Sequence, residues 1–435
     1  MAQTVEQLNS LLEREAPLLF QCLSPLGRAA FFPPDIPVQA EQARGKAFNA
    51  TIGQVTNGHG EILALPSIAA ALQGLERQER NRAMLYSPPP GRPEVRQAWR
   101  DWQRRQVDDD VASSLPLVTL GLTHGLNLVG ELFVSEGTPI AVPAPFWGNY
   151  RQTFAMRRGG VVLSAPFYRR GRYNTEAIAE CLENAEDGRP ALAVLNLPSN
   201  PGGYSPTQEE RQAVRRSLLR LADERPLIVV CDDAYAGLVF QDDIPRRSLF
   251  WELVGAHDNL IPIKLDGATK EFSFFGGRVG FLTFGLSPDS PAFQALESKV
   301  KSLVRSGVGS PSATTQLLLL KGLQHPDVEL EVEAVRRCLQ ERHDVLHQAL
   351  READPEIIRP LPFNSGCFAL LQLPSQCSLD SNQVRLHLLE HEDTGLVSIA
   401  PNYLRIAFCS VDAPSLPEVV QRIEKGLREM SSALG

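Results

Sequence analysis

The sequence predicts an α/β fold with a large domain built on a seven-stranded, mostly parallel sheet flanked by helices. Seven short apolar runs rich in β-branched residues form a regular series, at positions 118–121, 139–143, 161–167, 191–198, 227–232, 259–265 and 278–285. Helix-like segments separate most of these runs, for example 125–135, 174–186 and 207–223. Strands that alternate with helices indicate βαβ units and a parallel sheet.

The last connection of this series predicts one exception to the parallel arrangement. The stretch from Leu265 to Arg278 is too short to contain a packed crossover helix. A parallel return needs roughly a dozen or more residues and usually a helix. We therefore expect the seventh strand to run antiparallel to its neighbour.

The two ends of the chain predict a second, smaller α+β domain. A short helix is expected within residues 1–20, stopped at Pro17, and a proline-rich loop and a short apolar run at 48–54 follow it. After Pro311 the pattern becomes helical, with two short strands near 367–373 and 404–408 and a closing amphipathic helix at 419–430. The expected division is an N-terminal segment of the small domain, the large domain and the C-terminal small domain, at 1–60, 61–315 and 316–435.

The composition is typical of a globular protein without a basic surface for nucleic acid. Of the 435 residues, 43% are hydrophobic and 22% are charged, and the net charge is −8. A negative net charge lacks the electrostatic signature of nucleic-acid binding. The scattered histidines and the absence of HExxH and CxxC patterns predict no metal site.

The cysteines and the N-terminal sequence predict a cytoplasmic protein. Seven cysteines lie along the chain without paired spacing, and several of them fall inside apolar runs, which favours a reducing compartment. Glu13, Arg14 and Glu15 interrupt the N-terminal stretch, so neither a signal peptide nor a membrane span is predicted.

The stretch from Leu265 to Gly280, LDGATKEFSFFGGRVG, carries the strongest chemical signal. It presents Lys270 after one apolar run and Arg278 eight residues later. Burial near other cations lowers the pKa of a lysine and makes it a nucleophile, while arginine binds phosphate or carboxylate with its planar fork. A polar hairpin with two solvated cations is the alternative. The chain has only seven lysines, and none lies between Lys46 and Lys264, which favours a functional Lys270.

Further candidates follow the ends of other predicted strands, where ligands of parallel sheets bind. The sequence GLTHG opens a helix at Gly121, and free backbone N–H groups there suit an anion, although a simple strand–helix turn would look the same. Trp147 in PFWGNY offers a flat surface for a ring, or packs in the core. Asn200 in NLPSNPGGY is a binding residue or a turn former.

The fifth run ends in CDDAYAG, with Asp232 at the strand end and Tyr235 three residues later. An acid in this place is either a helix cap or a buried carboxylate that needs a cationic partner. Five strand ends that meet at one edge of the sheet indicate a binding site more strongly than any single motif does.

The order of these motifs resembles that of a known family. NPGG, then DxAY, then a lysine with an arginine eight residues later, then YLRIAF is similar to the pyridoxal-phosphate-dependent aminotransferases of the aspartate aminotransferase fold (fold type I, class I/II). The resemblance covers the chain from about Phe48 to the C-terminus. It implies an amino-acid aminotransferase that moves an amino group between an L-amino acid and a 2-oxo acid.

The resemblance also implies three catalytic residues. Lys270 would hold pyridoxal 5'-phosphate as a Schiff base and then act as general base and acid. Asp232 would keep the pyridinium nitrogen protonated, so that the ring acts as an electron sink. Tyr235, together with Asn200, would hydrogen-bond the ring oxygen.

The other implied contacts concern the cofactor's ring and phosphate. Trp147 would stack on the ring. The phosphate would be held by Arg278, Thr269 and the backbone amides of Leu122 and Thr123. Tyr86, in the sequence YSPPPG, would reach the phosphate of a neighbouring subunit, so a homodimer with shared active sites is expected.

The implied substrate contacts come from both ends of the chain. Arg405 would bind the α-carboxylate, Gly53 would line that pocket, and Asn200 would contact the substrate. Arg305, in the sequence KSLVR, would bind the distal carboxylate of glutamate, 2-oxoglutarate or aspartate across the dimer. The alternative for Arg305 is an exposed arginine at the end of a helix.

The chain departs from the family pattern at two places, and other reactions stay open. Gly267 stands where the family often has a serine, which removes one phosphate-binding hydroxyl that Thr269 could replace. NPGG replaces the commoner NPTG. A lyase or decarboxylase of the same fold, or a non-catalytic protein that binds the cofactor, would share the same motifs.

Overall fold

The computed structural model describes residues 4–33, 35–57, 60–105, 107, 111–183, 185, 189–373 and 380–432. Its central sheet has seven strands, which confirms the prediction. In chain order they are β2 (Leu117–Thr119), β3 (Pro139–Ala144), β4 (Val161–Pro166), β7 (Ala191–Asn196), β8 (Leu227–Asp232), β9 (Leu260–Gly267) and β10 (Gly280–Phe284).

The strand order in this sheet is β2-β10-β9-β8-β7-β3-β4. Neighbouring strands from β9 to β4 are parallel, whereas β10 is antiparallel to both β9 and β2. The expectation of an antiparallel seventh strand is therefore confirmed. The strand lies between β9 and β2, so its return hairpin brings residues 268–279 to the carboxyl ends of the parallel strands.

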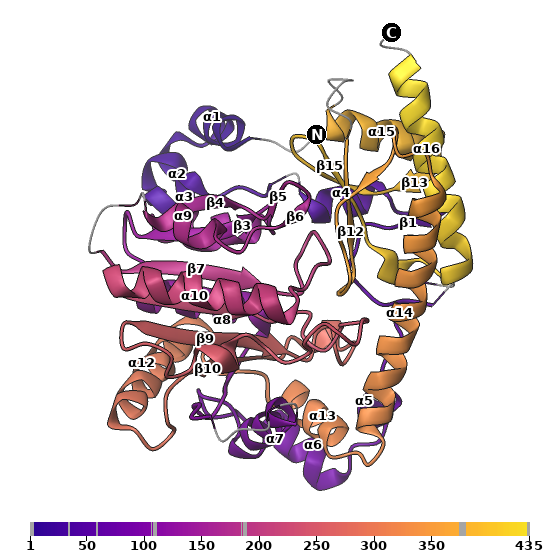
Figure 1. Ribbon diagram of the computed structural model, residues 1–435. Helices are drawn as coiled ribbons and strands as arrows, with labels where there is room; N and C mark the ends of the chain where they lie inside the picture. Colours follow the sequence, from indigo (N-terminus) through magenta and orange to yellow (C-terminus); the bar gives the residue numbers. More distant parts are fainter. Residues whose placement is uncertain are drawn as a thin grey trace.

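Helices cover both faces of the central sheet (Figure 1). Along β7, Ala193 and Leu195 face a core that includes residues of α9 (Ala177–Glu183), α10 (Gln208–Glu224) and α11 (Phe250–Leu253). Leu192 and Val194 face the opposite core, which includes residues of α8 (Gly121–Phe133), η1 (Arg151–Met156) and α12 (Pro291–Gly307). This alternation follows from the two-residue period of a strand that is buried on both faces.

A second, smaller sheet of four antiparallel strands has the order β11-β12-β15-β14. Its strands are β11 (Arg359–Pro360), β12 (Ala369–Gln372), β14 (Val397–Ile399) and β15 (Tyr403–Ile406). Three helices belong to the same part of the chain, namely α14 (Val328–Glu352), α15 (Ser381–His391) and α16 (Leu416–Ser432). In Figure 1 this sheet and α16 form the upper right of the molecule, and α14 runs downward beside the central sheet.

The N-terminal segment contacts this smaller unit. The strand β1 (Phe48–Asn49) pairs in parallel with β13 (Thr394–Gly395). The helix α4 (Ile36–Gln42) contacts both β13 and β14. The boundaries 1–60, 61–315 and 316–435 stay a prediction.

The helix expected at the N-terminus ends at Glu15, and a second helix begins at Pro17. A proline fits the first turn of a helix, where its missing N–H group has no partner in any case, so the residue that stops one helix starts the next. The other helical elements are α1 (Val5–Glu15), α2 (Pro17–Cys22), α3 (Pro25–Ala29), α5 (Pro66–Gln73), α6 (Arg77–Met84), α7 (Pro93–Arg104), η2 (Phe275–Gly277), α13 (Ala313–Leu323), η4 (Phe408–Ser410) and η5 (Ala413–Ser415). A small hairpin completes the fold, with β5 (Tyr168–Arg169) and β6 (Arg172–Tyr173).

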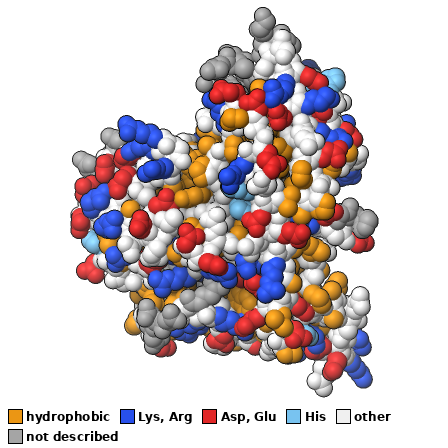
Figure 2. All heavy atoms as spheres, turned by 45° about the vertical axis from the view of Figure 1, so that its right-hand side comes forward, with side chains coloured by type: hydrophobic (Ala, Val, Ile, Leu, Met, Phe, Trp, Pro, Cys, Tyr) orange, Lys and Arg blue, Asp and Glu red, His pale blue; other side chains and the backbone are white. Residues whose placement is uncertain are grey.

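The surface carries both signs of charge. Figure 2 shows Lys and Arg side chains interspersed with Asp and Glu over the face that it presents, with apolar side chains between them. Within the described parts of the chain, no helix is both long enough and apolar enough to cross a membrane.

Candidate active site

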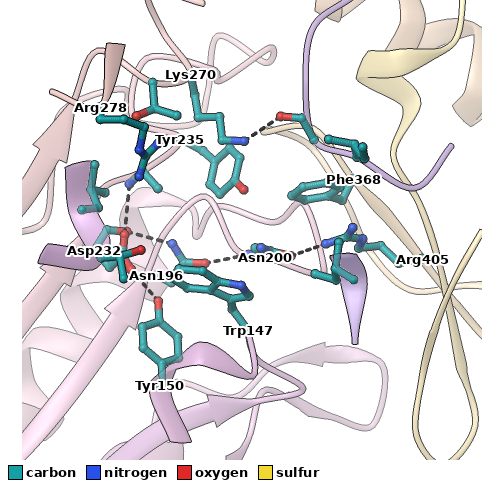
Figure 3. A pocket seen from close by; sticks show the side chains of 17 residues that line it. Trp147, Tyr150, Asn196, Asn200, Asp232, Tyr235, Lys270, Arg278, Phe368 and Arg405 are labelled. Carbon is teal, nitrogen blue, oxygen red and sulfur yellow. Dashed lines mark hydrogen bonds between the residues drawn. The ribbon is translucent and has the colours of Figure 1, made fainter. Parts of the chain in front are cut away.

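A cavity of about 270 Å³ lies at the carboxyl ends of the parallel strands, where the smaller sheet meets the central one. Figure 3 shows its lining side chains, with Lys270, Asp232 and Arg278 on one side and Arg405 with Phe368 on the other. Eleven of the thirteen predicted site residues line it: Gly53, Leu122, Thr123, Trp147, Asn200, Asp232, Tyr235, Thr269, Lys270, Arg278 and Arg405.

Lys270 lies in the hairpin between β9 and β10, and its amine reaches the N-terminal segment. Its Nζ donates a hydrogen bond of 2.6 Å to the backbone oxygen of Gly53. It also lies 5.3 Å from the ring centroid of Tyr235. Burial lowers the pKa of Lys270, and the charges of Arg405 and Arg278 lower it further, while two cysteines oppose the shift. A lowered pKa increases the fraction of the amine that is neutral and therefore nucleophilic.

Gly53 has no room for a side chain. A Cβ atom there would lie 2.6 Å from Cζ of Phe368 and 3.3 Å from Nζ of Lys270. Glycine therefore lets the backbone of the N-terminal segment approach the lysine closely.

Asp232 is the last residue of β8, and its side chain is only 2% exposed. Its Oδ2 accepts a 2.6 Å hydrogen bond from the hydroxyl group of Tyr150, and its Oδ1 accepts a 3.3 Å bond from the backbone N–H of Ala234. Among the described residues it forms no ion pair. Burial raises the pKa of this carboxyl group to about 6, against the opposing effect of the Tyr150 bond. A buried carboxylate of this kind calls for a cation from a bound ligand.

Arg278 closes the same hairpin and lies beside the N-terminus of α8. Its φ of 50° is left-handed, and a Cβ atom on Gly121 would lie only 2.4 Å from its Nη2. Its Nη1 donates a 3.3 Å hydrogen bond to the backbone oxygen of Phe275. The first turn of α8 has no side-chain cap, and Leu122 and Thr123 of that turn line the cavity. A guanidinium group next to free helix N–H groups is a site for an anion.

The position three residues before Lys270 differs from the family pattern for a steric reason. Gly267 ends β9, and a Cβ atom there would lie 2.6 Å from the backbone oxygen of Val279 and 2.8 Å from Cα of Gly280. The close approach of β10 therefore excludes a serine in this backbone arrangement. Thr269, two residues later, lines the cavity and carries a hydroxyl group.

Arg405 lies on β15, an inner strand of the smaller sheet, and it is only 1% exposed. Its Nη2 donates to the backbone oxygen of Thr51 at 2.6 Å, while its Nε is buried without a partner. The guanidinium carbon lies 4.2 Å from the ring centroid of Phe368. Burial lowers the pKa of Arg405 to about 10. Among the described residues no carboxylate pairs with it, so the site presents a buried, uncompensated cation.

Asn200 connects Arg405 to the central sheet. Its Oδ1 accepts a 2.9 Å hydrogen bond from Nη1 of Arg405, and its backbone N–H donates to Oδ1 of Asn196 at 2.7 Å. Asn196 in turn donates from Nδ2 to the backbone oxygen of Asp232 at 2.9 Å. This chain of hydrogen bonds fixes the two buried charges, Asp232 and Arg405, in one framework.

Two aromatic predictions fall on the cavity wall. Trp147 follows β3 and packs edge-on against Tyr150, with ring centroids 5.8 Å apart. Tyr235 packs edge-on against Phe368, with ring centroids 5.5 Å apart. Burial raises the pKa of the Tyr235 phenol far above its ordinary value, which keeps it a hydrogen-bond donor.

The two remaining predicted residues do not line the cavity of their own chain. Tyr86 is 96% exposed in the loop between α6 and α7, and Arg305 is exposed in the last turn of α12. Both were expected to act across a dimer interface, so their roles stay a prediction.

Sequence reasoning missed three residues that shape the site. Tyr150 bonds Asp232 although 82 positions separate them, and its signal was its presence in PFWGNY, three residues after Trp147. Asn196 begins the NLPSNPGG segment, in which the sequence analysis named only Asn200 as a candidate. Phe368 contacts the guanidinium group of Arg405, and no local pattern marks it.

Comparisons with known proteins place this geometry in a family. The model of the family described as aminotransferase class I and II matches residues 47–423. A 2-aminoadipate transaminase of Thermus thermophilus is 27% identical over 381 residues, which cover 85% of this chain and 87% of that protein. An LL-diaminopimelate aminotransferase of Aquifex aeolicus is 27% identical over 297 residues, which cover 68% and 70%.

Solved structures share the fold. An aminotransferase from Anaerococcus prevotii aligns with a TM-score of 0.78 at 22% identity and covers 90% of this chain and 94% of its own. A kynurenine aminotransferase of Pyrococcus horikoshii aligns with a TM-score of 0.77 at 19% identity, over 94% and 98%. The family match spans most of the chain. The chain therefore belongs to the class I and II aminotransferases, as a pyridoxal-phosphate-dependent enzyme that transfers amino groups between amino acids and 2-oxo acids.

Proposed function

We propose that the cavity around Lys270 is the active site of this aminotransferase, with Asp232 and Arg405 as its two fixed charges. The observation that carries the proposal is that both side chains are buried in one cavity and neither has an ion-pair partner among the described residues. Buried charges without partners are costly. A positive ring nitrogen at Asp232 and a substrate carboxylate at Arg405 would compensate them.

The donor set fits pyridoxal phosphate. When bound, this cofactor supplies an electron sink for the carbon that carries the amino group. Asp232, held by the hydroxyl of Tyr150, would pair with the ring nitrogen and keep it protonated. Trp147 would stack on the ring. The hydroxyl of Tyr235 and the Nδ2 group of Asn200 would donate to the ring oxygen.

The phosphate would occupy the anion site at the start of α8. Arg278 would bind it with its fork, Thr269 with its hydroxyl group, and Leu122 and Thr123 with their backbone N–H groups. The side chain that the family pattern would supply at position 267 is absent for steric reasons. Thr269 therefore supplies the hydroxyl contact from the hairpin.

Lys270 would attach the cofactor covalently and then move protons. Its lowered pKa favours the neutral amine, which accepts a proton from the substrate carbon at Nζ and returns it later. The hydrogen bond to the backbone oxygen of Gly53 orients this amine toward the cavity.

Arg405 would bind the α-carboxylate of the amino acid, beside Gly53 and Asn200. The names of two groups of relatives, 2-aminoadipate transaminase and aspartate/prephenate aminotransferase, refer to acidic amino acids among others, which supports a dicarboxylic substrate. Arg305 of a second subunit would bind the distal carboxylate of glutamate, 2-oxoglutarate or aspartate.

The enzyme would act as a cytoplasmic homodimer with shared active sites. Exposed Tyr86 follows two exposed apolar residues, Met84 and Leu85, and a contiguous exposed apolar segment is typical of an interaction surface. Tyr86 would cross the interface to the phosphate of the partner. The cytoplasmic assignment rests on the free cysteines among the described residues.

The experiment that tests the proposal follows the absorption spectrum of the bound cofactor while single L-amino acids are added without an acceptor. Transamination converts the cofactor to its amine form, and a 2-oxo acid reverses the change. Release of ammonia with the keto acid would instead indicate a lyase, and an unchanged spectrum with every amino acid would contradict an enzymatic role for this cavity.

A further inference from the structure

A second cavity, of about 770 Å³, adjoins the active site. It lies between the loop after β3, the helix α4 and the part of the smaller sheet that α15 covers. The two cavities share three lining residues, Ile36, Trp147 and Asn200. Its volume is within the range of small-molecule sites and exceeds that of the cavity around Lys270.

The register of the smaller sheet places part of the wall of this second cavity beside Arg405. In the ladder between β14 and β15, Val397 lies directly opposite Arg405. Directly opposed residues of antiparallel strands project from the same face of a sheet. Val397 lines the second cavity, so a substrate held at Arg405 would lie next to the wall of that cavity.

Arg385 on α15 lines this cavity and is 3% exposed. Its Nε donates a 3.0 Å hydrogen bond to Oδ1 of Asn382, one turn earlier on the helix. Its Nη1 is buried without a hydrogen-bond partner, and among the described residues no carboxylate forms an ion pair with it. Burial lowers the pKa of Arg385, with no anion to offset the effect. A buried guanidinium group in this state is costly unless an anion binds it.

Asp35 also lines the cavity but does not neutralise Arg385. Its Oδ2 lies 3.7 Å from the position of a Cβ atom on Gly148, on the wall formed by the loop after β3. The two side chains form no ion pair, and burial raises the pKa of the Asp35 carboxyl group. Among the described residues, the other side chains with an amide or hydroxyl group that line the cavity are uncharged, namely Gln39, Gln42, Asn200, Asn382 and Ser398.

We propose that the second cavity receives the side chain of one of the enzyme's substrates and that Arg385 binds a carboxylate at the end of that side chain. The inference rests on the proposed function, because it takes Arg405 as the site of the α-carboxylate. Because Asn200 and Trp147 line both cavities, a side chain that reaches Arg385 would pass them. The cavity therefore serves acidic side chains longer than those of glutamate and aspartate, whose distal carboxylates the proposed function assigns to Arg305 of a second subunit.

The test measures kcat/KM for pairs of amino donors that have the same length and differ only at the end of the side chain. Aspartate pairs with 2-aminobutyrate, glutamate with norvaline, and 2-aminoadipate with norleucine. Within each pair, the kcat/KM of the acidic donor divided by that of the neutral donor isolates the contribution of the distal carboxylate. We expect this ratio to increase with length in the unmodified holoenzyme.

The variant Arg385→Met removes the charge and keeps an unbranched side chain. It should lower the ratio for 2-aminoadipate by about 30-fold or more, the range for a lost charge-assisted contact in a desolvated site. Arg385→Lys keeps the charge without the planar fork and should give an intermediate ratio. The matched control is Arg337→Met, which removes an equal charge from α14 where the side chain is 74% exposed, and it should leave the ratio unchanged.

Thermal unfolding separates a binding role from a structural one. Removal of a buried, unpaired charge should not lower the melting temperature, so Arg385→Met should melt at or above the temperature of the unmodified protein. An unchanged 2-aminoadipate ratio in Arg385→Met would overturn the inference at any melting temperature, as would a loss of that ratio in Arg305→Ala but not in Arg385→Met. If no donor changes the cofactor spectrum of the unmodified enzyme, the proposed function itself fails.

Discussion

The amine of Lys270 and the backbone oxygen of Gly53 are joined by a hydrogen bond of 2.6 Å, across 217 positions of the chain. The bond links the β9–β10 hairpin of the central sheet to the N-terminal segment, whose strand β1 pairs with β13. The amine therefore lies where this segment meets the central sheet, and its environment depends on their packing.

Lys270 should be the residue that binds the cofactor covalently. Borohydride reduction of the holoenzyme followed by peptide mapping should find the label on Lys270. Lys264 is the internal control, because it lies six residues earlier in β9 and is buried. Its ion pairs with Asp233 and Asp266, at 2.5 and 3.2 Å, raise its pKa and keep it protonated. A label on Lys264 or on any other lysine would contradict the assignment.

The Gly53→Ala variant should weaken substrate binding and stability together. Its new methyl group would displace the ring of Phe368, which in turn supports the guanidinium group of Arg405. Overpacking of this kind costs about 1–3 kcal/mol in the free energy of unfolding. Urea denaturation and the KM for an amino acid should both report the change. A variant with normal KM and normal stability would show that the site tolerates the extra carbon.

Asp232 should make the stability of the cofactor-free protein depend on pH. Its pKa is raised from 3.8 to about 6, so the folded state holds the proton more tightly than the unfolded state. The contribution of Asp232 to the free energy of unfolding is therefore greatest below pH 4 and is lost as the pH rises through 6. Between pH 5 and pH 7.5 the loss is about 1–2 kcal/mol. The difference in urea-unfolding free energy between these two pH values should be smaller by that amount in Asp232→Asn. Identical pH profiles for both proteins would refute the raised pKa.

Tyr86 should connect cofactor binding to dimer formation. Light scattering should detect a dimer, and Tyr86→Phe should bind the cofactor about tenfold or more weakly, because one hydrogen bond to a charged phosphate is lost. Cofactor titration by fluorescence measures this. A fully active monomer would contradict the shared site, and so would an unchanged cofactor affinity in Tyr86→Phe.

Arg305 and Arg405 should differ in their effect on substrate classes. If Arg305 binds a distal carboxylate across the dimer, Arg305→Ala should weaken glutamate and aspartate by about 30-fold or more and leave monocarboxylic amino acids nearly unchanged. Arg405→Ala should weaken both classes alike, since every substrate has an α-carboxylate. If Arg305→Ala weakened dicarboxylic and monocarboxylic substrates equally, Arg305 would not bind a distal carboxylate and would be an ordinary surface residue.

Much of the fold and part of the site followed from local patterns. The apolar runs predicted the seven strands because a sheet buried on both faces needs continuous apolar segments. The short Leu265–Arg278 connection predicted the antiparallel strand. Residues at strand ends, such as Asp232 and Lys270, were found because the carboxyl ends of parallel strands meet at one edge.

The contacts that sequence reasoning missed depend on packing between distant segments. Tyr150 reaches Asp232 only through the placement of the segment after β3. Phe368 meets Arg405 through the pairing of β12 with β15. The sequence around Arg385 does not distinguish it from an exposed arginine on a helix. Its side chain is buried, and its Nη1 lacks a hydrogen-bond partner, because other elements pack over α15. No local pattern encodes these contacts.

The close approach of β10 to Gly267 has an evolutionary consequence. A single substitution to serine at this position would place Cβ at 2.6 Å from a backbone atom that cannot rotate away. A lineage could exchange glycine and serine here only if the neighbouring strand shifted as well. Because the contact is with backbone atoms of Val279 and Gly280, no change of side chain at those two positions would relieve it, and glycine should persist at position 267 wherever β9 and β10 keep this spacing.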